Sequence, residues 1–272
     1  MIADFPIANL FPEAKLAIQA VLEASKTVMD VYNTNFSSIL KHDNEPITEA
    51  DLQSNQIIQK ILSDSDHPIL SEESKDNKKR LDSKKIWIVD PLDGTSDFIK
   101  KTGEFTIMIS LVEEHIPILG VIYWPTKSTL YLAQKDQGAF KSENNVWSKI
   151  SVSKISDLKN SRAVGSRYHI SDIEQNLIKR LNISQFTSRG SSLKVSDISS
   201  GNAELYFTTT NKIKQWDTCA SYCLITEAGG NMTDMFGNNL QYNTERLNHK
   251  NGLLVSNGLI HDKIVKEFKK LN

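Results

Sequence analysis

Asp90 directly follows a short apolar run, and Asp93 stands three residues later. Residues 90 to 95 read Asp-Pro-Leu-Asp-Gly-Thr. The run, Ile86–Val89, is rich in β-branched residues, so we predict a buried strand that ends at Asp90, where Pro91 interrupts the ladder. Carboxylates at a strand end, beside a glycine that lets backbone approach a ligand, suit a hard cation such as Mg²⁺. From these residues alone, a polar turn with Asp93 as a helix cap is an equal alternative.

Paired acids stand after a second short strand. Glu72 and Glu73 follow the run Pro68–Ser71. Adjacent like charges are disfavoured unless they are solvated or neutralised. An isolated Glu-Glu pair therefore indicates a solvated loop, and a role in binding needs support from elsewhere in the chain.

Two more acids lie at predicted helix starts. Thr48 and Asp51 open a helix and have the spacing of a capping box. A carboxylate in that first turn can also face an active site, and the two roles are compatible. Asp217 precedes a helix over residues 218–228 that stops at Gly229-Gly230, so Asp217 is a natural N-cap.

The rest of the chain must supply the scaffold for these acids. From Pro12 to about Asn33, apolar residues recur at a spacing close to 3.6, which predicts a long amphipathic helix. Four later runs predict an antiparallel meander: Phe105–Leu111, Leu119–Tyr123, Thr129–Ala133 and a strand that begins at Gly138. Strands and helices alternate after the polar segment Lys141–Ser156. We place the boundary there, between an N-terminal α+β half (residues 1–145) and a C-terminal α/β half (residues 146–272).

Composition restricts the class of protein. The chain has 272 residues, 39% of them hydrophobic and 24% charged, with a net charge of -1. These values are ordinary for a soluble globular protein, and the near-zero charge provides no field that would recruit nucleic acid. No apolar run approaches the roughly 18 residues of a membrane span, and the N-terminus lacks a signal-peptide pattern. We expect Cys219 and Cys223 to be small core residues, since two ligands alone do not form a zinc site.

The order and separation of the acids resemble those of the inositol-monophosphatase superfamily of Mg²⁺-dependent, lithium-sensitive phosphatases. The resemblance runs over nearly the whole chain, and three motifs carry it: Ser71-Glu72-Glu73-Ser74, Trp87–Thr95, and Trp216-Asp217 with Gly229-Gly230. It implies the α/β (α+β) fold of the inositol-monophosphatase and fructose-1,6-bisphosphatase type. That fold is a layered α-β-α-β-α sandwich with its metal site between the two halves.

Within the superfamily, the chain is most similar to the bacterial 3'(2'),5'-bisphosphate nucleotidases of the CysQ type. Four segments that metal chemistry does not require carry this likeness: residues 68–73, 98–106, 117–123 and 190–194. Inositol monophosphatases usually follow the acid pair with small residues and glycine. Here Ser74-Lys75-Asp76-Asn77 follows it, which counts against inositol phosphate as the substrate.

The resemblance implies a site for two or three Mg²⁺ ions. The implied metal ligands are the carboxylates of Glu72, Asp90, Asp93 and Asp217 and the carbonyl of Leu92. Two ions about 3.5–4 Å apart can stabilise both the attacking and the leaving oxygen of a phosphate ester. The implied catalytic residues are Glu72, Thr95 and Asp51, with Thr95, oriented by Asp51, positioning the water that the metal activates.

The same resemblance implies contacts to the substrate. The backbone N–H groups of Gly94 and Thr95 would meet the phosphate. The further substrate-binding residues implied are Glu72, Leu92, Asp93, His169, Ser191, Ser192, Lys194 and Asp217. A cationic Lys194 near a second phosphate is chemically sensible. The alternative is a solvated lysine beside a helix-capping serine.

The resemblance implies an enzyme of sulfur assimilation that hydrolyses adenosine 3',5'-bisphosphate to AMP and phosphate, while the metal chemistry follows from the acids. An inositol monophosphatase or another sugar-phosphate phosphatase of the superfamily is the nearest alternative, and a metal-binding regulatory protein without turnover is a third. The D-x-x-D-G-T spacing does not fit the D-x-D-x-T motif of haloacid-dehalogenase-type phosphatases. The partner is a small nucleotide rather than nucleic acid. We expect a cytoplasmic location, with peripheral association at the inner membrane left open by relatives.

Overall fold

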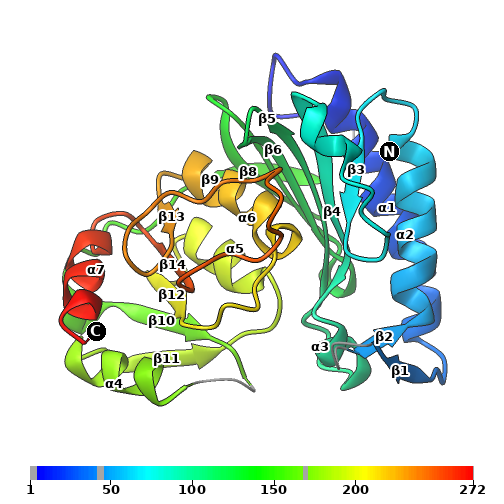
Figure 1. The fold of residues 1–272 in the computed structure, drawn as a ribbon. Helices are drawn as coiled ribbons and strands as arrows, with labels where there is room; N and C mark the ends of the chain where they lie inside the picture. Colours follow the sequence, from blue (N-terminus) through cyan, green and yellow to red (C-terminus); the bar gives the residue numbers. More distant parts are fainter. Residues whose placement is uncertain (1–4, 42–45, 168–170, 272) are drawn as a thin grey trace.

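The computed structural model describes residues 5–41, 46–167 and 171–271. Five layers of helices and sheets alternate across these residues (Figure 1). The predicted α-β-α-β-α sandwich is therefore confirmed. In order, the layers are α1 (Pro12–Tyr32) and α2 (Glu49–Leu62), a seven-stranded sheet, α5 (Leu193–Ser199) and α6 (Gln215–Glu227), a five-stranded sheet, and α4 (Asp172–Arg180) with α7 (His261–Lys269).

The seven-stranded sheet is built from the first part of the chain. Its strands lie in the order of the sequence: β3 (Ile69–Ser71), β4 (Lys85–Asp93), β5 (Thr106–Glu113), β6 (Ile116–Trp124), β7 (Thr129–Gln134), β8 (Gly138–Glu143) and β9 (Val146–Ile150). β3 and β4 are parallel, and from β4 onward each strand is antiparallel to the next. The predicted meander is thus confirmed. The division of the chain at residue 145 stays a prediction, and β9 still belongs to this sheet.

The predicted end of the strand at Asp90 is wrong. β4 continues to Asp93, with Asp90 opposite Met108, Asp93 opposite Thr106 and a register shift between them. Two residues of β4 therefore face a single residue of β5, which is the geometry of a β-bulge. A bulge leaves a position out of the ladder, so Pro91, which has no N–H to donate, is accommodated and pairing resumes at Asp93.

Helices α1 (Pro12–Tyr32) and α2 (Glu49–Leu62) cover one face of this sheet, and a two-stranded ribbon of β1 (Ser38–Leu40) and β2 (Pro46–Thr48) lies between them in the sequence. The large hydrophobic core forms here, where Ala17, Val21 and Ile58 pack against Val89 and Ile109. α1 matches the helix predicted from Pro12. The periodic apolar face of α1 thus packs against this sheet.

The five-stranded sheet belongs to the second part of the chain. Its order is β11 (Gln185–Ser188), β10 (Arg162–Gly165), β12 (Leu205–Thr208), β14 (Leu253–Ser256) and β13 (Asn231–Thr233). α4 (Asp172–Arg180) and α7 (His261–Lys269) pack on its outer face. The short strands β11 and β13 were not predicted.

Helix α6 (Gln215–Glu227) lies between the two sheets together with α5 (Leu193–Ser199). Because it is covered on both sides, α6 buries residues around most of its circumference, including Cys219 and Cys223, both free thiols in the core. The helix approaches β6 so closely that a Cβ at Gly120 would lie 2.5 Å from the Ala220 carbonyl oxygen. Only glycine allows this contact between sheet and helix.

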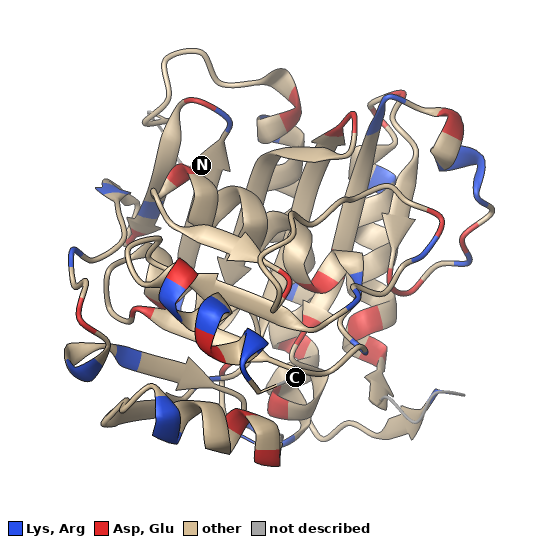
Figure 2. Ribbon diagram, turned by 60° about the vertical axis from the view of Figure 1, so that its left-hand side comes forward, with Lys and Arg blue, Asp and Glu red and all other residues tan. Residues whose placement is uncertain are grey.

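Acidic and basic residues alternate along the surface elements of both halves (Figure 2). This distribution agrees with the net charge of -1 and with the absence of a strong field of one sign. In the part of the chain that the structure describes, no helix combines the length and apolar character needed to cross a bilayer.

Candidate metal centre

Three carboxylates converge where the first sheet meets α6. Glu72 follows β3, Asp90 lies in β4, and Asp217 lies in the first turn of α6. A ligand oxygen from each lies within 4.8 Å of the other two. Residues that are far apart in the sequence thus form one acidic cluster, and their assignment as metal ligands stays a prediction.

The electrostatics of this cluster call for a cation. Burial raises the pKa of Asp90 well above its usual range, and the carboxylates of Glu72, Asp93 and Asp217 raise it further. Buried like charges at this separation are unfavourable unless a positive charge compensates them. Hard oxygen ligands from carboxylates, with a main-chain carbonyl nearby, are the set that Mg²⁺ prefers, so the residues present fit this ion.

Asp93 is held by residues on both sides of the site. Its Oδ2 accepts hydrogen bonds from the Ser192 backbone N–H (2.5 Å) and from the Thr106 hydroxyl (3.3 Å). Burial raises the pKa of Asp93, while the ammonium group of Lys194 acts in the opposite direction. Both of these donors bind the same oxygen, Oδ2.

Thr95 and Asp51 form the hydrogen-bonded pair that the family resemblance implied. The Thr95 hydroxyl donates to Asp51 Oδ1 at 3.0 Å, and the Leu92 carbonyl oxygen lies 3.3 Å from the same hydroxyl. Asp51 Oδ2 accepts from the backbone N–H and the hydroxyl of Thr48, at 2.7 and 2.6 Å. One carboxylate therefore serves the helix start and the site together. Burial raises the pKa of Asp51 in spite of these donors.

The turn after Asp93 shapes the floor of the site. Gly94 has φ +94°, a conformation that L side chains rarely adopt, and a Cβ here would lie 3.1 Å from Ser191 Cβ. The Leu92 backbone N–H donates to Asp90 Oδ1 at 3.1 Å, which fixes the orientation of that carboxylate. The short helix α3 (Thr95–Ile99) begins directly after this turn.

The sequence suggested Asp217 as the N-cap of α6, and this prediction is wrong. The helix begins two residues earlier, at Gln215, with Lys214 as its N-cap. Asp217 Oδ2 accepts the Lys214 backbone N–H at 2.7 Å. The side chain thus supports the helix start from the third position and still reaches the acidic cluster.

Three of the four residues predicted to contact the nucleotide lie in the part of the chain that the structure describes. Ser191, Ser192 and Lys194 lie around the start of α5, and Lys194 Nζ lies 5.3 Å from the centre of the Tyr206 ring. Burial lowers the pKa of Lys194, whereas the nearby carboxylates, Asp93 first among them, raise it. Lys194 is thus half-buried beside acids, unlike the solvated lysine of the alternative. His169 lies outside the described residues.

A cation that sequence reasoning missed lies beside the acids. Lys41 Nζ is 2.8 Å from Glu72 Oε1 and 2.5 Å from Glu73 Oε1. Partial burial works against the charged form of Lys41, but the two carboxylates outweigh it and raise the pKa of the ammonium group. Lys41 therefore compensates one of the two negative charges of the Glu-Glu pair, which is not simply solvated. No local signal connects Lys41 to acids 31 and 32 residues further along the chain.

The similarity of this chain to known proteins identifies its family. A sequence model described as the inositol monophosphatase family matches residues 10–272. The chain belongs to that family. It is 37% identical over 231 residues to the 3'(2'),5'-bisphosphate nucleotidase CysQ of Buchnera aphidicola, covering 82% of this chain and 85% of that protein. Identity to the CysQ nucleotidase of Escherichia coli K12 is 36%, over 82% and 91% of the two chains.

Solved structures agree with this assignment. The crystal structure of CysQ from Bacteroides thetaiotaomicron superposes with a TM-score of 0.78 at 31% identity, over 90% of this chain and 96% of that one. An inositol monophosphatase of Thermotoga maritima superposes with a TM-score of 0.82 at 24% identity, which shows the shared fold. The predicted family and its CysQ-type branch are confirmed as the proteins that this chain resembles.

Proposed function

We propose that this protein is a Mg²⁺-dependent phosphomonoesterase that removes the 3'-phosphate of adenosine 3',5'-bisphosphate and releases AMP and phosphate. The observation that carries the proposal is the cluster of Glu72, Asp90 and Asp217 beside the Thr95–Asp51 pair, in a chain similar to CysQ nucleotidases over most of its length.

The acids divide into ion-binding and proton-handling groups. Glu72, Asp90 and Asp217 would hold the metal, with Asp93 and the Leu92 carbonyl completing the set. Bound Mg²⁺ supplies positive charge that stabilises the attacking and leaving oxygens of the phosphate ester. The expected occupancy is two or three ions.

Thr95 and Asp51 orient the nucleophile. Because the Thr95 hydroxyl proton points to Asp51 Oδ1, a lone pair of the Thr95 oxygen can accept a hydrogen bond from water. As that water attacks phosphorus, its proton passes to Thr95 while the Thr95 proton passes to Asp51. The bond between phosphorus and the 3'-oxygen breaks, and the released 3'-oxygen takes a proton from solvent to become the 3'-hydroxyl of AMP. The raised pKa of Asp51 makes its carboxylate a stronger base than an ordinary aspartate, which suits it to accept this proton.

The second phosphate distinguishes the proposed substrate from a simple monoester. Lys194 supplies a cation at the start of α5, next to Ser191 and Ser192, while the backbone N–H groups of Gly94 and Thr95, close to Ser191, would meet the phosphate that is hydrolysed. We assign the 5'-phosphate and ribose side to Ser191, Ser192, Lys194 and His169. A dianionic phosphate would replace carboxylates as the partner of the Lys194 ammonium group.

The proposal is tested by measuring phosphate release from adenosine 3',5'-bisphosphate and from inositol 1-phosphate, with and without Mg²⁺. We expect Mg²⁺-dependent release with a strong preference for the nucleotide. Preference for inositol 1-phosphate would leave the metal chemistry standing and contradict the assignment of Ser191 to Lys194. No release from either substrate, despite Mg²⁺ binding, would favour a regulatory protein.

A further inference from the structure

A short segment of the second half, Arg189–Lys194, reaches across to the first half beside the candidate site. Its Ser192 N–H binds Asp93 at 2.5 Å, and its Ser192 hydroxyl lies 2.7 Å from the hydroxyl of Thr106. The position of this segment therefore determines how Asp93 is held. The same segment carries Lys194 and leads into α5.

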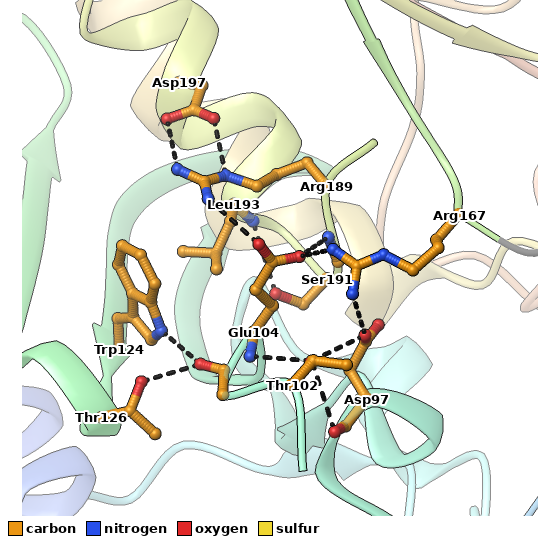
Figure 3. Close-up of polar contacts among 12 residues, drawn as sticks. Asp97, Thr102, Glu104, Trp124, Thr126, Arg167, Arg189, Ser191, Leu193 and Asp197 are labelled. Carbon is orange, nitrogen blue, oxygen red and sulfur yellow. Dashed lines mark hydrogen bonds and ion pairs between the residues drawn. The ribbon is translucent and has the colours of Figure 1, made fainter. Parts of the chain in front are cut away.

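Glu104 receives this segment on the side of the first half. Its Oε2 accepts the Gly190 backbone N–H and the Arg167 guanidinium, both at 2.8 Å, and its Oε1 accepts from Arg189 at 3.1 Å (Figure 3). All three donors belong to the second half, and Glu104 lies in the loop between α3 and β5. One carboxylate, 15% exposed, thus joins the two halves.

Further ion pairs keep the arginines in place. Arg189 makes a two-point contact with Asp197 on α5, at 2.8 and 3.3 Å, and its guanidinium lies 5.3 Å from the centre of the Trp124 ring. Arg167 Nη1 lies 3.6 Å from Asp97 Oδ1 on α3 (Figure 3). A planar guanidinium held at several points is a rigid donor, which makes the contact to Glu104 directional.

The backbone of the segment adopts a conformation that needs such support. Ser191 has φ +49°, an uncommon value for a residue other than glycine. A Cβ at Gly190 would lie 2.6 Å from both Asp97 Oδ2 and the Glu104 carbonyl oxygen, so the two halves touch here backbone to backbone. Conformations of this kind persist where the surroundings determine them and often occur at functional sites.

We propose that Glu104 is a positioning residue that holds the Arg189–Lys194 segment against Asp93 and so sets the affinity for the second phosphate of the substrate. The substrate part of this inference rests on the proposed function. A salt bridge that served stability alone would change the melting temperature and leave the balance between substrates as it was.

The test compares the wild type with Glu104→Gln on two nucleotides, adenosine 3',5'-bisphosphate and 3'-AMP, which lacks the second phosphate. The amide can still accept from Gly190 but cannot serve both arginines. We expect KM for the bisphosphate to rise about tenfold, the scale of one hydrogen bond to a charged group, with kcat changed less than about threefold. KM for 3'-AMP should change less than about threefold. An equal rise in both KM values, or none, would overturn the proposal.

A matched control and a double variant complete the design. Glu113→Gln removes a carboxylate from the far end of β5, where Glu113 lies 3.5 Å from Lys85, and should behave as wild type. Lys194→Met should by itself raise KM for the bisphosphate, and adding Glu104→Gln should then change KM little, because both act through one segment. Additive increases in KM in the double variant would contradict the inference that Glu104 and Lys194 act through one segment.

Hydrogen exchange separates the two proposals. In Glu104→Gln, the amides of Gly190 and Ser192 should exchange at least about tenfold faster than in the wild type, whatever the substrate. Unchanged exchange would refute the positioning role. Wild-type preference for inositol 1-phosphate, together with faster exchange in the variant, would refute only the proposed substrate. If Glu104→Gln does not fold, Arg167→Gln, whose side chain is 32% exposed, should show a smaller shift in the same direction.

Discussion

Replacing Asp51 by asparagine should separate activity from stability. In the wild type, Asp51 Oδ1 accepts the Thr95 hydroxyl at 3.0 Å. An asparagine of the same shape can place its oxygen toward Thr48 and its NH₂ group toward Thr95. The Thr95 hydroxyl would then donate to the Leu92 carbonyl, 3.3 Å away, and the amide would donate to one of the two lone pairs of the hydroxyl oxygen. The attacking water would have no carboxylate to which its proton could pass through Thr95.

The expected loss in kcat is about 10²- to 10⁴-fold, the usual contribution of a positioned general base. At 1.36 kcal/mol per factor of ten, this is about 2.7 to 5.4 kcal/mol in the activation barrier. The stability of the fold should change by only about 1 kcal/mol, because the hydrogen bonds around the side chain are exchanged rather than lost. For a chain of this size, that change shifts Tm by about 2–4 °C.

The pH dependence of stability has a definite sign. Burial raises the pKa of Asp51 in the folded state above its unfolded value of about 3.9. The folded state therefore prefers the protonated form, and the wild type loses stability as the pH rises from the unfolded pKa to the folded pKa. An asparagine side chain does not titrate, so the Asp51→Asn variant should gain stability relative to the wild type across this window and keep the gain at neutral pH.

The assays are phosphate release at saturating Mg²⁺ and thermal unfolding from pH 4 to pH 8. Thr95→Val is the matched variant, since it also breaks the pair but leaves a buried carboxylate with one donor fewer. It should lose similar activity and about 1–3 kcal/mol of stability. Asp51→Asn with kcat within about fivefold of the wild type would refute the assignment of Asp51 as the proton acceptor.

Three further outcomes follow from the structure. Asp90→Asn should reduce Mg²⁺-dependent turnover more than about 10³-fold in a folded protein, a loss in the upper part of the range for one positioned catalytic group, and near-normal turnover would contradict the metal site. Mg²⁺ at about 100 times its dissociation constant should stabilise the wild type by about 2.7 kcal/mol in thermal unfolding but not the Asp90→Asn variant, and equal stabilisation would place the ion elsewhere. Gly120→Ala should cost about 1–3 kcal/mol of stability, because its Cβ would lie 2.5 Å from the Ala220 carbonyl oxygen, and an unchanged Tm would show that α6 can move away from β6.

Local patterns predicted most of the elements. The apolar periodicity predicted α1 (Pro12–Tyr32), and the β-branched runs predicted β4 to β7, because these signals depend only on neighbouring residues. The extension of β4 to Asp93 was missed, since the bulge that accommodates Pro91 depends on the register of β5. The exposed strand β11 (Gln185–Ser188) was missed because no hydrophobic alternation marks it.

The acids of the site were found early for a different reason. Asp90, Asp93 and Thr95 lie within six residues, so their motif is visible before folding. Glu104 and Lys41 were not recognised as site residues, although Glu104 lies in the segment 98–106 that resembles the nucleotidases. Their partners are distant in the sequence: Glu104 is 86 residues from Gly190, and Lys41 is 31 residues from Glu72.

By itself, the sequence determined the chemistry that this protein can offer: hard oxygen ligands, a hydroxyl next to a glycine turn, and helices and strands to carry them. Only the tertiary structure decided which acids share a site, which cations neutralise them, and that Asp93 is held by Ser192, 99 residues away. The physical reason is that side-chain identity is local, whereas charge compensation and hydrogen-bond satisfaction depend on which surfaces the core brings together.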